Sequence, residues 1–337
     1  MARYFGLRPE TNYGVENTAN PIKYLEVGKC TLAPPSGANL DLDTIEETPT
    51  RTKRGYYSPS GDVEIALDIP TMIDFLYFTF GVKIDSGSAA EGLIHEIYPN
   101  AGKKLPSFTS YVGIDDGNEE DYEYVVYGCC VSKLSISVSD GIAVATISIQ
   151  AQKDGINDLK TDSEITIDDT YPIAFYEAQT FIGNEETSSR TTSLDFEFDN
   201  KITASNGQAL GSMHPYRLPS SGKEPTVKTT VFYNGRDILI KYWGSSTGPT
   251  CNTTYETYKV LFEDEKENKL TLFFPKFSFD NAPATLEGSE EIKQDLEFKI
   301  LKGKTNLLDE SVVRTSVLAT VELAGTGETE TEPETEP

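Results

Sequence analysis

The two histidines are the side chains of this sequence best suited to proton transfer near neutral pH. His95 and His214 lie far apart along the chain, and neither belongs to a motif. We recognise no glycine-rich phosphate loop after a predicted strand and no nucleophile elbow of the Gly-x-Ser-x-Gly type. We therefore interpret both histidines as structural and predict that the chain is not an enzyme, with no catalytic residue, cofactor or metal site.

A run of carboxylates at 115–121, with the sequence DDGNEED, offers a second kind of chemistry. Its oxygen atoms suit a hard cation, but the spacing does not match a calcium-binding EF-hand loop. A weak calcium site and a solvated hairpin turn both stay open, and we favour the turn. Two carboxylates could also hydrolyse a glycoside, but among 54 Asp and Glu residues their proximity carries little information.

The four cysteines show no metal-like spacing. Cys129 and Cys130 are neighbours in a predicted strand, so their side chains point to opposite faces. We interpret all four as small apolar residues of a protein that folds in a reducing cytoplasm, with a disulfide between Cys30 and Cys251 as the alternative.

The formal net charge of −25 argues against binding to nucleic acid or to anionic membranes, because both need basic residues. Two interpretations of the charge stay open: solubility, or a wall that repels DNA and lets it slide past. No apolar run is long enough to span a membrane, and we recognise no secretory signal.

The chain repeats one order of elements. Residues 63–81 predict a strand and then a short helix that ends at Gly81, and residues 227–244 predict the same pair ending at Gly244. Pro70 suits the first turn of the first helix, and Asn234 is the expected N-cap of the second. A hairpin and two further strands follow each helix, with 133–136 matched to 276–279 and 147–151 matched to 296–300. We interpret this order as a structural duplication; chance likeness between β patterns is the alternative.

Alternating apolar and polar residues over most of the chain predict a mainly β fold with two tandem modules, each with one short helix. We expect the following segments: an extended N-terminal arm at 1–21, a first module at 22–155, a connector at 156–189, a second module at 190–303, a C-terminal segment at 304–323 and a disordered acidic tail at 324–337.

Each module contains one long loop, 28–60 or 199–225, and long loops in compact domains are often functional. The candidate contact residues in these loops are Arg51, Lys53, Arg54, Met213, His214, Tyr216 and Arg217, and those in the N-terminal arm are Tyr4, Phe5 and Tyr13. A contact with an acidic face of a neighbouring subunit and a merely solvated loop are equally compatible with the basic run at 51–54.

Five short segments carry a family resemblance. The run 105–108 (LPSF), the Tyr127-Gly128-Cys129 sequence and the strands 133–136 and 147–149 occur in an order that resembles one group of major tail tube proteins of tailed bacterial and archaeal viruses. The opening segment 10–14 (ETNYG) also resembles their N-terminus. The likeness covers most of residues 1–303 and lies in the order of the elements and the general pattern of the sequence.

The resemblance implies that each module is a small β-sandwich or partial barrel, and that strands of neighbouring modules join around a central channel. A duplicated subunit would give a homotrimeric, pseudo-sixfold ring, and stacked rings would form a tube for DNA passage in the virion tail. The implied partners are further copies of the chain and the tape-measure, tail terminator and baseplate or tip proteins. A β-sandwich for adhesion or carbohydrate binding, or another structural virion module, is the alternative.

Overall fold

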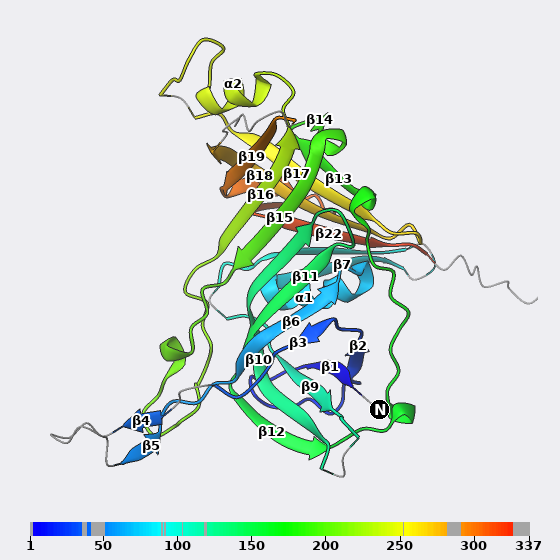
Figure 1. Ribbon diagram of the computed structural model, residues 1–337, viewed down its shortest axis with the longest axis vertical. Helices are drawn as coiled ribbons and strands as arrows, with labels where there is room; N and C mark the ends of the chain where they lie inside the picture. The colour runs from blue at the N-terminus through cyan, green and yellow to red at the C-terminus, as the bar shows by residue number, and fades with distance from the viewer. Residues whose placement is uncertain are drawn as a thin grey trace, which may run out of the picture.

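The computed structural model describes residues 3–35, 39–41, 51–88, 90, 92–102, 104–117, 120–251, 253–281 and 291–325. The structure is mainly β with two α-helices, as predicted, and it is elongated, with α2 at one end and strands β4 and β5 projecting near the other (Figure 1). Most of the predicted acidic tail, from 326 onward, lies outside the described residues.

The first half of the chain consists of β1 (Tyr4–Pro9), β2 (Lys23–Leu25), β3 (Lys29–Cys30), β4 (Asn39–Asp41), β5 (Thr52–Arg54), β6 (Ser60–Ala66), α1 (Ile69–Phe80), β7 (Gly81–Ser88), β8 (Gly92–Pro99), β9 (Phe108–Ile114), β10 (Tyr122–Val138), β11 (Val144–Gln150) and β12 (Lys153–Asp158). The second half consists of β13 (Ala178–Ile182), β14 (Glu185–Glu186), β15 (Thr191–Asp199), β16 (Glu224–Phe232), α2 (Asp237–Trp243), β17 (Glu256–Glu263), β18 (Lys269–Asn281), β19 (Lys293–Ile300), β20 (Gly303–Asn306), β21 (Val312–Thr315) and β22 (Leu318–Leu323). Short 3₁₀ turns lie at Asp162–Glu164, Phe175–Glu177, Ser188–Arg190 and Ala204–Gly207.

The two halves share one pattern of strand pairing. In the first half, β6 pairs with β11, β11 with the C-terminal part of β10, and the N-terminal part of β10 with β9. In the second half, β16, β19, β18 and β17 pair in the same way. The flanking strands also correspond, since β1 and β13 lie beside β9 and β17, and β12 and β22 lie beside β10 and β18. A duplicated module would produce this pattern, and the duplication itself is our inference.

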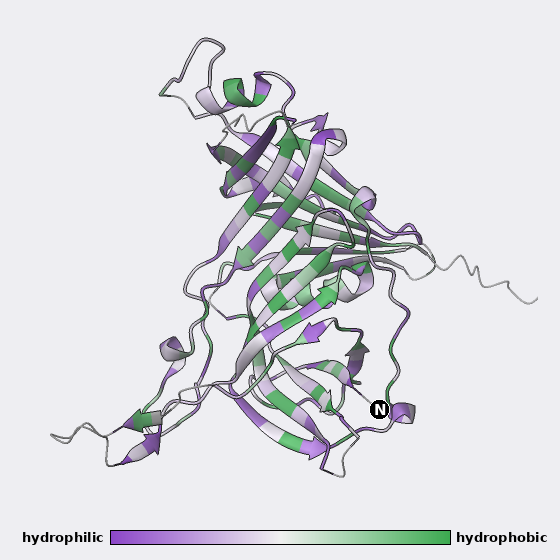
Figure 2. Cartoon of the chain, in the orientation of Figure 1, coloured by the Kyte–Doolittle hydropathy of each residue, from purple (hydrophilic) through white to green (hydrophobic). Residues whose placement is uncertain are grey.

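The strand pairing aligns the second half of the chain with the first two residues away from the alignment expected from the sequence. Ile147 pairs with Val63, and Phe298 pairs with the corresponding Val227, so Ile147 matches Phe298 rather than Leu296. Side chains alternate between faces along a strand, so a shift of two residues keeps every side chain on its face. The alternating hydropathy colours along the strands in Figure 2 follow the same period. The hydrophobic pattern therefore predicts the faces but cannot distinguish these two alignments.

Helix α1 has strong signals at both ends. The Asp68 side chain accepts a hydrogen bond from the Thr71 backbone N–H (3.1 Å) and another from the Tyr171 N–H (3.0 Å). Pro70 lies in the first turn, and Gly81 ends the helix in the left-handed conformation (φ 93°), as predicted. The chain positions α1 in the core, where Phe75, Leu76, Phe78 and Phe80 are buried, among other residues.

Helix α2 is shorter and less well capped. Its N-cap position is occupied by Arg236, whose side chain makes no cap hydrogen bond, so the expected cap at Asn234 is wrong. Gly244 ends the helix in the left-handed conformation (φ 73°), as predicted. Ile238 is the one buried residue within α2.

One hydrophobic core runs through both halves. A single cluster of buried side chains includes Phe5, Leu76 and Leu134 from the first half and Phe196 and Leu272 from the second. The strands of both halves likewise belong to one hydrogen-bonded system, because β10 pairs with β15. The halves are therefore joined as closely as the strands within each half.

The segments expected to flank the modules also contribute strands. Strand β1 lies within the expected N-terminal arm and pairs with β2 and β9, β13 lies within the expected connector, and β22 lies within the expected C-terminal segment. The apolar alternation of these short runs suits a half-buried sheet, which explains why they are incorporated.

Candidate assembly interface

The boundary between the two halves is a ladder of antiparallel strands. The residues of β10 from Lys133 to Val138 pair with those of β15 from Asp199 to Leu194. On one face, the Lys133 Nζ lies 2.7 Å from a Glu197 carboxylate oxygen. On the other face, Leu134, Ile136, Phe196 and Phe198 are buried in the core. This ladder joins the first half of the chain to the second.

Residues on the other side of this boundary cover the C-terminal end of helix α1. The ring of Phe80, at the end of α1, contacts the ring of Phe198 on β15, with 4.8 Å between centroids. Asn200, which is fully buried and follows β15, donates hydrogen bonds to the Thr79 carbonyl (2.9 Å) and to the Val131 carbonyl (3.0 Å). These contacts satisfy a carbonyl at the C-terminal end of α1, where helices leave carbonyls without an intrahelical partner.

The sheet that contains this boundary ends at β3 on one side and at the C-terminal part of β18 on the other. Its strand order is β3, β6, β11, β10, β15, β16, β19, β18. Strand β3 pairs with β6 through Lys29 and Cys30, and the Thr31 N–H extends this pairing with a hydrogen bond to the Asp62 carbonyl (2.8 Å). In the described parts of the chain, the other edge of β3 and the other edge of residues 278–281 pair with no further strand. Both ends of the sheet therefore offer an edge for pairing.

The two long loops predicted to make contacts lie side by side, although they come from different halves. The Tyr57 N–H donates to the Met213 carbonyl (2.8 Å), and the rings of Tyr57 and His214 meet edge to face at 5.6 Å. Tyr56 Oη also donates to the Ala204 carbonyl (2.7 Å). We call residues 39–41, 51–57 and 201–223 the projecting arm, because β4 and β5 extend away from the body beside the second loop (Figure 1).

Most of the predicted arm residues point to solvent. Arg51, Lys53, Arg54 and Arg217 are exposed, and Tyr216 is 76% exposed. Met213 is also exposed, and His214 is half-buried against Tyr57. The meeting of the two loops could not be predicted from the sequence, since the contacts use backbone groups and single aromatic rings.

The N-terminal candidates are placed differently from expectation. Tyr4 and Phe5 are buried in β1 rather than displayed on an extended arm, and Phe5 pairs with Leu25 on one side and Val112 on the other. Tyr13 is partly buried and packs beside Cys130. The burial of Phe5 within the chain's own core explains the difference, because an apolar strand with two available neighbours is more stable in the sheet than in water.

Three of the segments that carry the family resemblance, 10–14, 105–108 and 127–129, meet at one carboxylate. Glu10 accepts hydrogen bonds from Ser107 Oγ (2.7 Å), from the Gly128 N–H (2.8 Å) and from the Gly14 N–H (2.8 Å). Gly128 has a positive φ of 66°, and a Cβ there would lie 3.1 Å from the Tyr13 ring. Glycine is thus required at this position, and Glu10 anchors the opening segment to β9 and β10.

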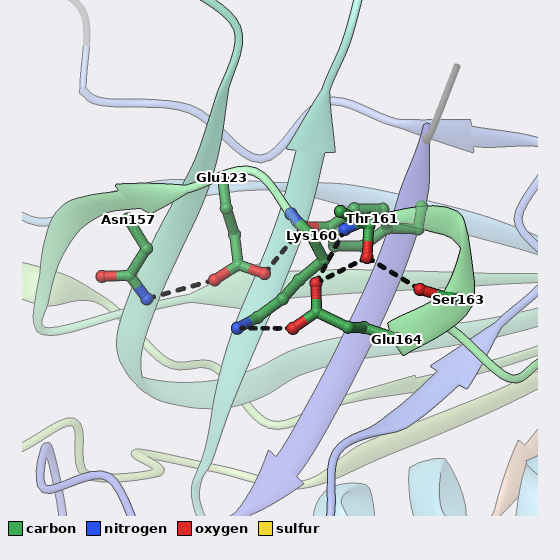
Figure 3. Close-up of polar contacts among 7 residues, drawn as sticks. Glu123, Asn157, Lys160, Thr161, Ser163 and Glu164 are labelled. Carbon is green, nitrogen blue, oxygen red and sulfur yellow. Dashed lines mark hydrogen bonds and ion pairs between the residues drawn. The ribbon is translucent and has the colours of Figure 1, made fainter.

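A second carboxylate, that of Glu123, is likewise held by several hydrogen bonds. Glu123 is fully buried and accepts hydrogen bonds from Tyr4 Oη (2.8 Å) and from Asn157 Nδ2 (3.1 Å). Figure 3 shows Glu123 and Asn157 beside the turn that contains Lys160 and Glu164. Burial, together with the Glu123 hydrogen bond, raises the pKa of Tyr4 well above its usual range. This network holds β1, β10 and β12 together.

The chemistry-bearing residues form no catalytic arrangement in the described residues. His95 Nδ1 lies 2.7 Å from an Asp85 carboxylate oxygen on the neighbouring strand, and His214 lies in the projecting arm. The stretch 244–248 does match the letters of the Gly-x-Ser-x-Gly pattern, but it follows a helix and not a strand, so it forms no nucleophile elbow.

No group of three metal-ligating side chains occurs where the structure describes the chain, and Asp115 and Asp121 both accept a hydrogen bond from the Gly117 N–H. All four cysteines are free thiols, and burial raises the pKa of Cys130 to about 12. The alternative disulfide between Cys30 and Cys251 is therefore absent. No described helix has the length and apolar character needed to cross a membrane.

The comparison with protein families gives one finding. No curated protein matches the chain. The family model of the phage tail tube protein matches residues 2–300, which covers β1 through β19. This match agrees with the resemblance of the segments around Glu10, and it covers far more than half of the chain. The chain belongs to the phage tail tube protein family, which makes it a structural component of a phage tail.

Proposed function

We propose that the chain assembles with copies of itself into rings, and that stacked rings form the tail tube through which DNA passes. The observation that carries this proposal is the sheet that ends at β3 and β18, with the β10–β15 ladder in its middle. If the two halves are sibling modules, the ladder between them is the template for the ladder between two chains.

The template predicts which residues pair between copies. Ser278 corresponds to Lys133, because each pairs with the strand that follows, at Lys299 and Ser148 respectively. Ala33 corresponds in the same way to Asp199, the partner of Lys133. We therefore expect Ser278 of one copy to lie opposite Ala33 of the next copy.

This pairing is head-to-tail, since β18 and β3 are different edges, and a head-to-tail contact builds a closed ring or an open helix. Three copies would supply the pseudo-sixfold ring, because each copy provides two module positions. The acidic composition suits a channel wall that does not hold DNA, since like charges repel. Rings would be assembled in the host cytoplasm and completed in the tail by the tape-measure, terminator and baseplate or tip proteins.

The projecting arm is the proposed contact between rings. It extends away from the body, it carries the exposed Lys53, Arg54 and Tyr216, and it is built from both halves. Tyr4 and Phe5 are buried in the subunit, so Tyr13 is the N-terminal candidate whose side chain is partly exposed.

A cysteine pair tests the ring contact directly. The variant carries Ala33→Cys and Ser278→Cys, in a background where the half-buried Cys30 and the exposed Cys251 are replaced by serine. Assembly followed by mild oxidation should link chains into covalent rings, seen as a ladder that ends at a closed species on a non-reducing gel. The control pair Ala33→Cys and Asp295→Cys places the second thiol away from the proposed edge. Equal cross-linking by both pairs, or monomers without rings in electron micrographs of the wild-type chain, would contradict the proposal.

A further inference from the structure

Helix α2 lacks the cover that helix α1 receives. Phe80, the last residue of α1, is fully buried by contacts that include Phe198 of the second half. Trp243, the last residue of α2, is only partly buried, and its neighbour Tyr242 is 45% exposed. In Figure 1, α2 lies at the end of the molecule near β18 and β19, away from the first half.

The two helices occupy corresponding positions relative to the strands of their halves. Each helix follows the strand β6 or β16, and each ends at a left-handed glycine, Gly81 or Gly244, so Phe80 and Trp243 are equivalent. The residue that covers Phe80 comes from β15, across the β10–β15 ladder. At the other end of the sheet, no strand of the described chain occupies the place of β15 beyond β18.

The pairing also identifies the counterpart of Phe198. Phe196 pairs with Val227, and Cys30 pairs with the equivalent Val63, so Leu32 stands two residues beyond Cys30 where Phe198 stands two residues beyond Phe196. Cys30 and Leu32 face the core side of this edge, where Leu32 is buried and Cys30 is half-buried, since Lys29 and Thr31, which alternate with them, are exposed. The β3 edge therefore carries the apolar side chains of Cys30 and Leu32, and Leu32 occupies the position equivalent to that of Phe198 at the β15 edge.

We propose that α2 is a docking surface for a second copy of this chain, in which the Cys30–Leu32 edge covers Trp243 as Phe198 covers Phe80. The partner is a second copy because the proposed contact between β18 of one copy and β3 of the next would repeat the arrangement of the β10–β15 boundary within the chain. A tryptophan fits this role because its larger ring would fill the space that Leu32 leaves relative to Phe198. This inference rests on the proposed ring assembly, and it identifies Trp243 as a residue whose surroundings change when two copies join.

The chain contains a single tryptophan, so its fluorescence reports on α2 alone. Subunits and rings of the wild-type protein are separated by sedimentation, and the emission spectrum and acrylamide quenching of Trp243 are measured in each. We expect the emission of the rings to move to shorter wavelength and the quenching constant to fall, because the indole leaves water. Rings with the emission and quenching of the subunit would overturn the docking of α2 and leave the ring assembly standing. A wild-type chain that forms no rings would overturn both.

A variant supplies the second measurement. Trp243→Ala should raise the dissociation constant of the rings by about tenfold or more, since truncation of a buried aromatic anchor removes much of a contact's free energy. Tyr176→Ala removes another aromatic ring that is 71% exposed, and it should leave the dissociation constant unchanged. The unfolding midpoint of the isolated subunit checks that both variants are folded. Equal dissociation constants for Trp243→Ala and the wild type would contradict the inference.

Discussion

The two halves of the molecule pair their strands alike but use their helices differently. Helix α1 has 12 residues, a carboxylate N-cap and a neighbouring half that buries its end. Helix α2 has 7 residues, no side-chain cap and one buried residue. Residues of the second half cover the end of α1, whereas no described residues of a further half cover the end of α2.

The largest effect should come from the ends of the two helices. Phe80→Ala removes a fully buried ring and should lower the free energy of unfolding of the isolated subunit by about 3–5 kcal/mol. Trp243→Ala should lower it by about 1 kcal/mol, since the subunit buries this ring only in part. Denaturant unfolding of both variants measures the contrast, and equal losses would show that α2 is already covered within one chain.

The hydrogen bonds across the internal boundary should have the next largest effect. Asn200→Ala leaves the carbonyls of Thr79 and Val131 without this donor and should cost about 1–3 kcal/mol. Asn206→Ala alters an exposed side chain of the same residue type and serves as the control. If thermal unfolding shows the same small change for both, Asn200 does not hold the end of α1.

The N-terminal ends of the helices give a smaller contrast. Asp68→Ala removes the cap of α1 and the link to Tyr171, and should cost about 1–2 kcal/mol. Asp237→Ala, at the exposed first turn of α2, should change the subunit by less than about 0.5 kcal/mol. Hydrogen exchange of the two helices separates these effects, and comparable increases in exchange at both would count against the difference in capping.

The smallest effect on the subunit should come from the projecting arm. The double variant Lys53→Glu and Arg54→Glu alters exposed residues, so the free energy of unfolding should stay within about 0.5 kcal/mol of the wild type. Assembled tubes should be shorter, because the arm is the proposed contact between rings. Tubes of normal length in electron micrographs would remove Lys53 and Arg54 from that contact.

The sequence predicted the strands, the helices and their glycine ends because these depend on local patterns. Alternation predicted the faces of β16 and β19, and Gly81 and Gly244 predicted where the helices stop. The pattern could not predict that β1 and β13 complete the sheets, since a short alternating run carries the same signal in an arm and in a sheet.

The contacts of the candidate interface depend on distant residues, and for that reason they escaped sequence reasoning. Asn200 reads as a loop residue until its amide is seen at the end of α1. The meeting of Tyr57 with Met213 and His214 uses a backbone group and one ring face, which leave no periodic trace. Glu10 was predicted only as part of a resemblance, and the four hydrogen bonds that its carboxylate accepts explain why that segment has its sequence.

The mass of an isolated ring counts the chains that complete one turn and so decides whether each chain supplies two module positions. Native mass spectrometry of rings released from the assembled protein should give the mass of three chains, since each chain supplies two successive positions. A ring of six chains would contradict the account, because its two halves would then not occupy equivalent places around the channel.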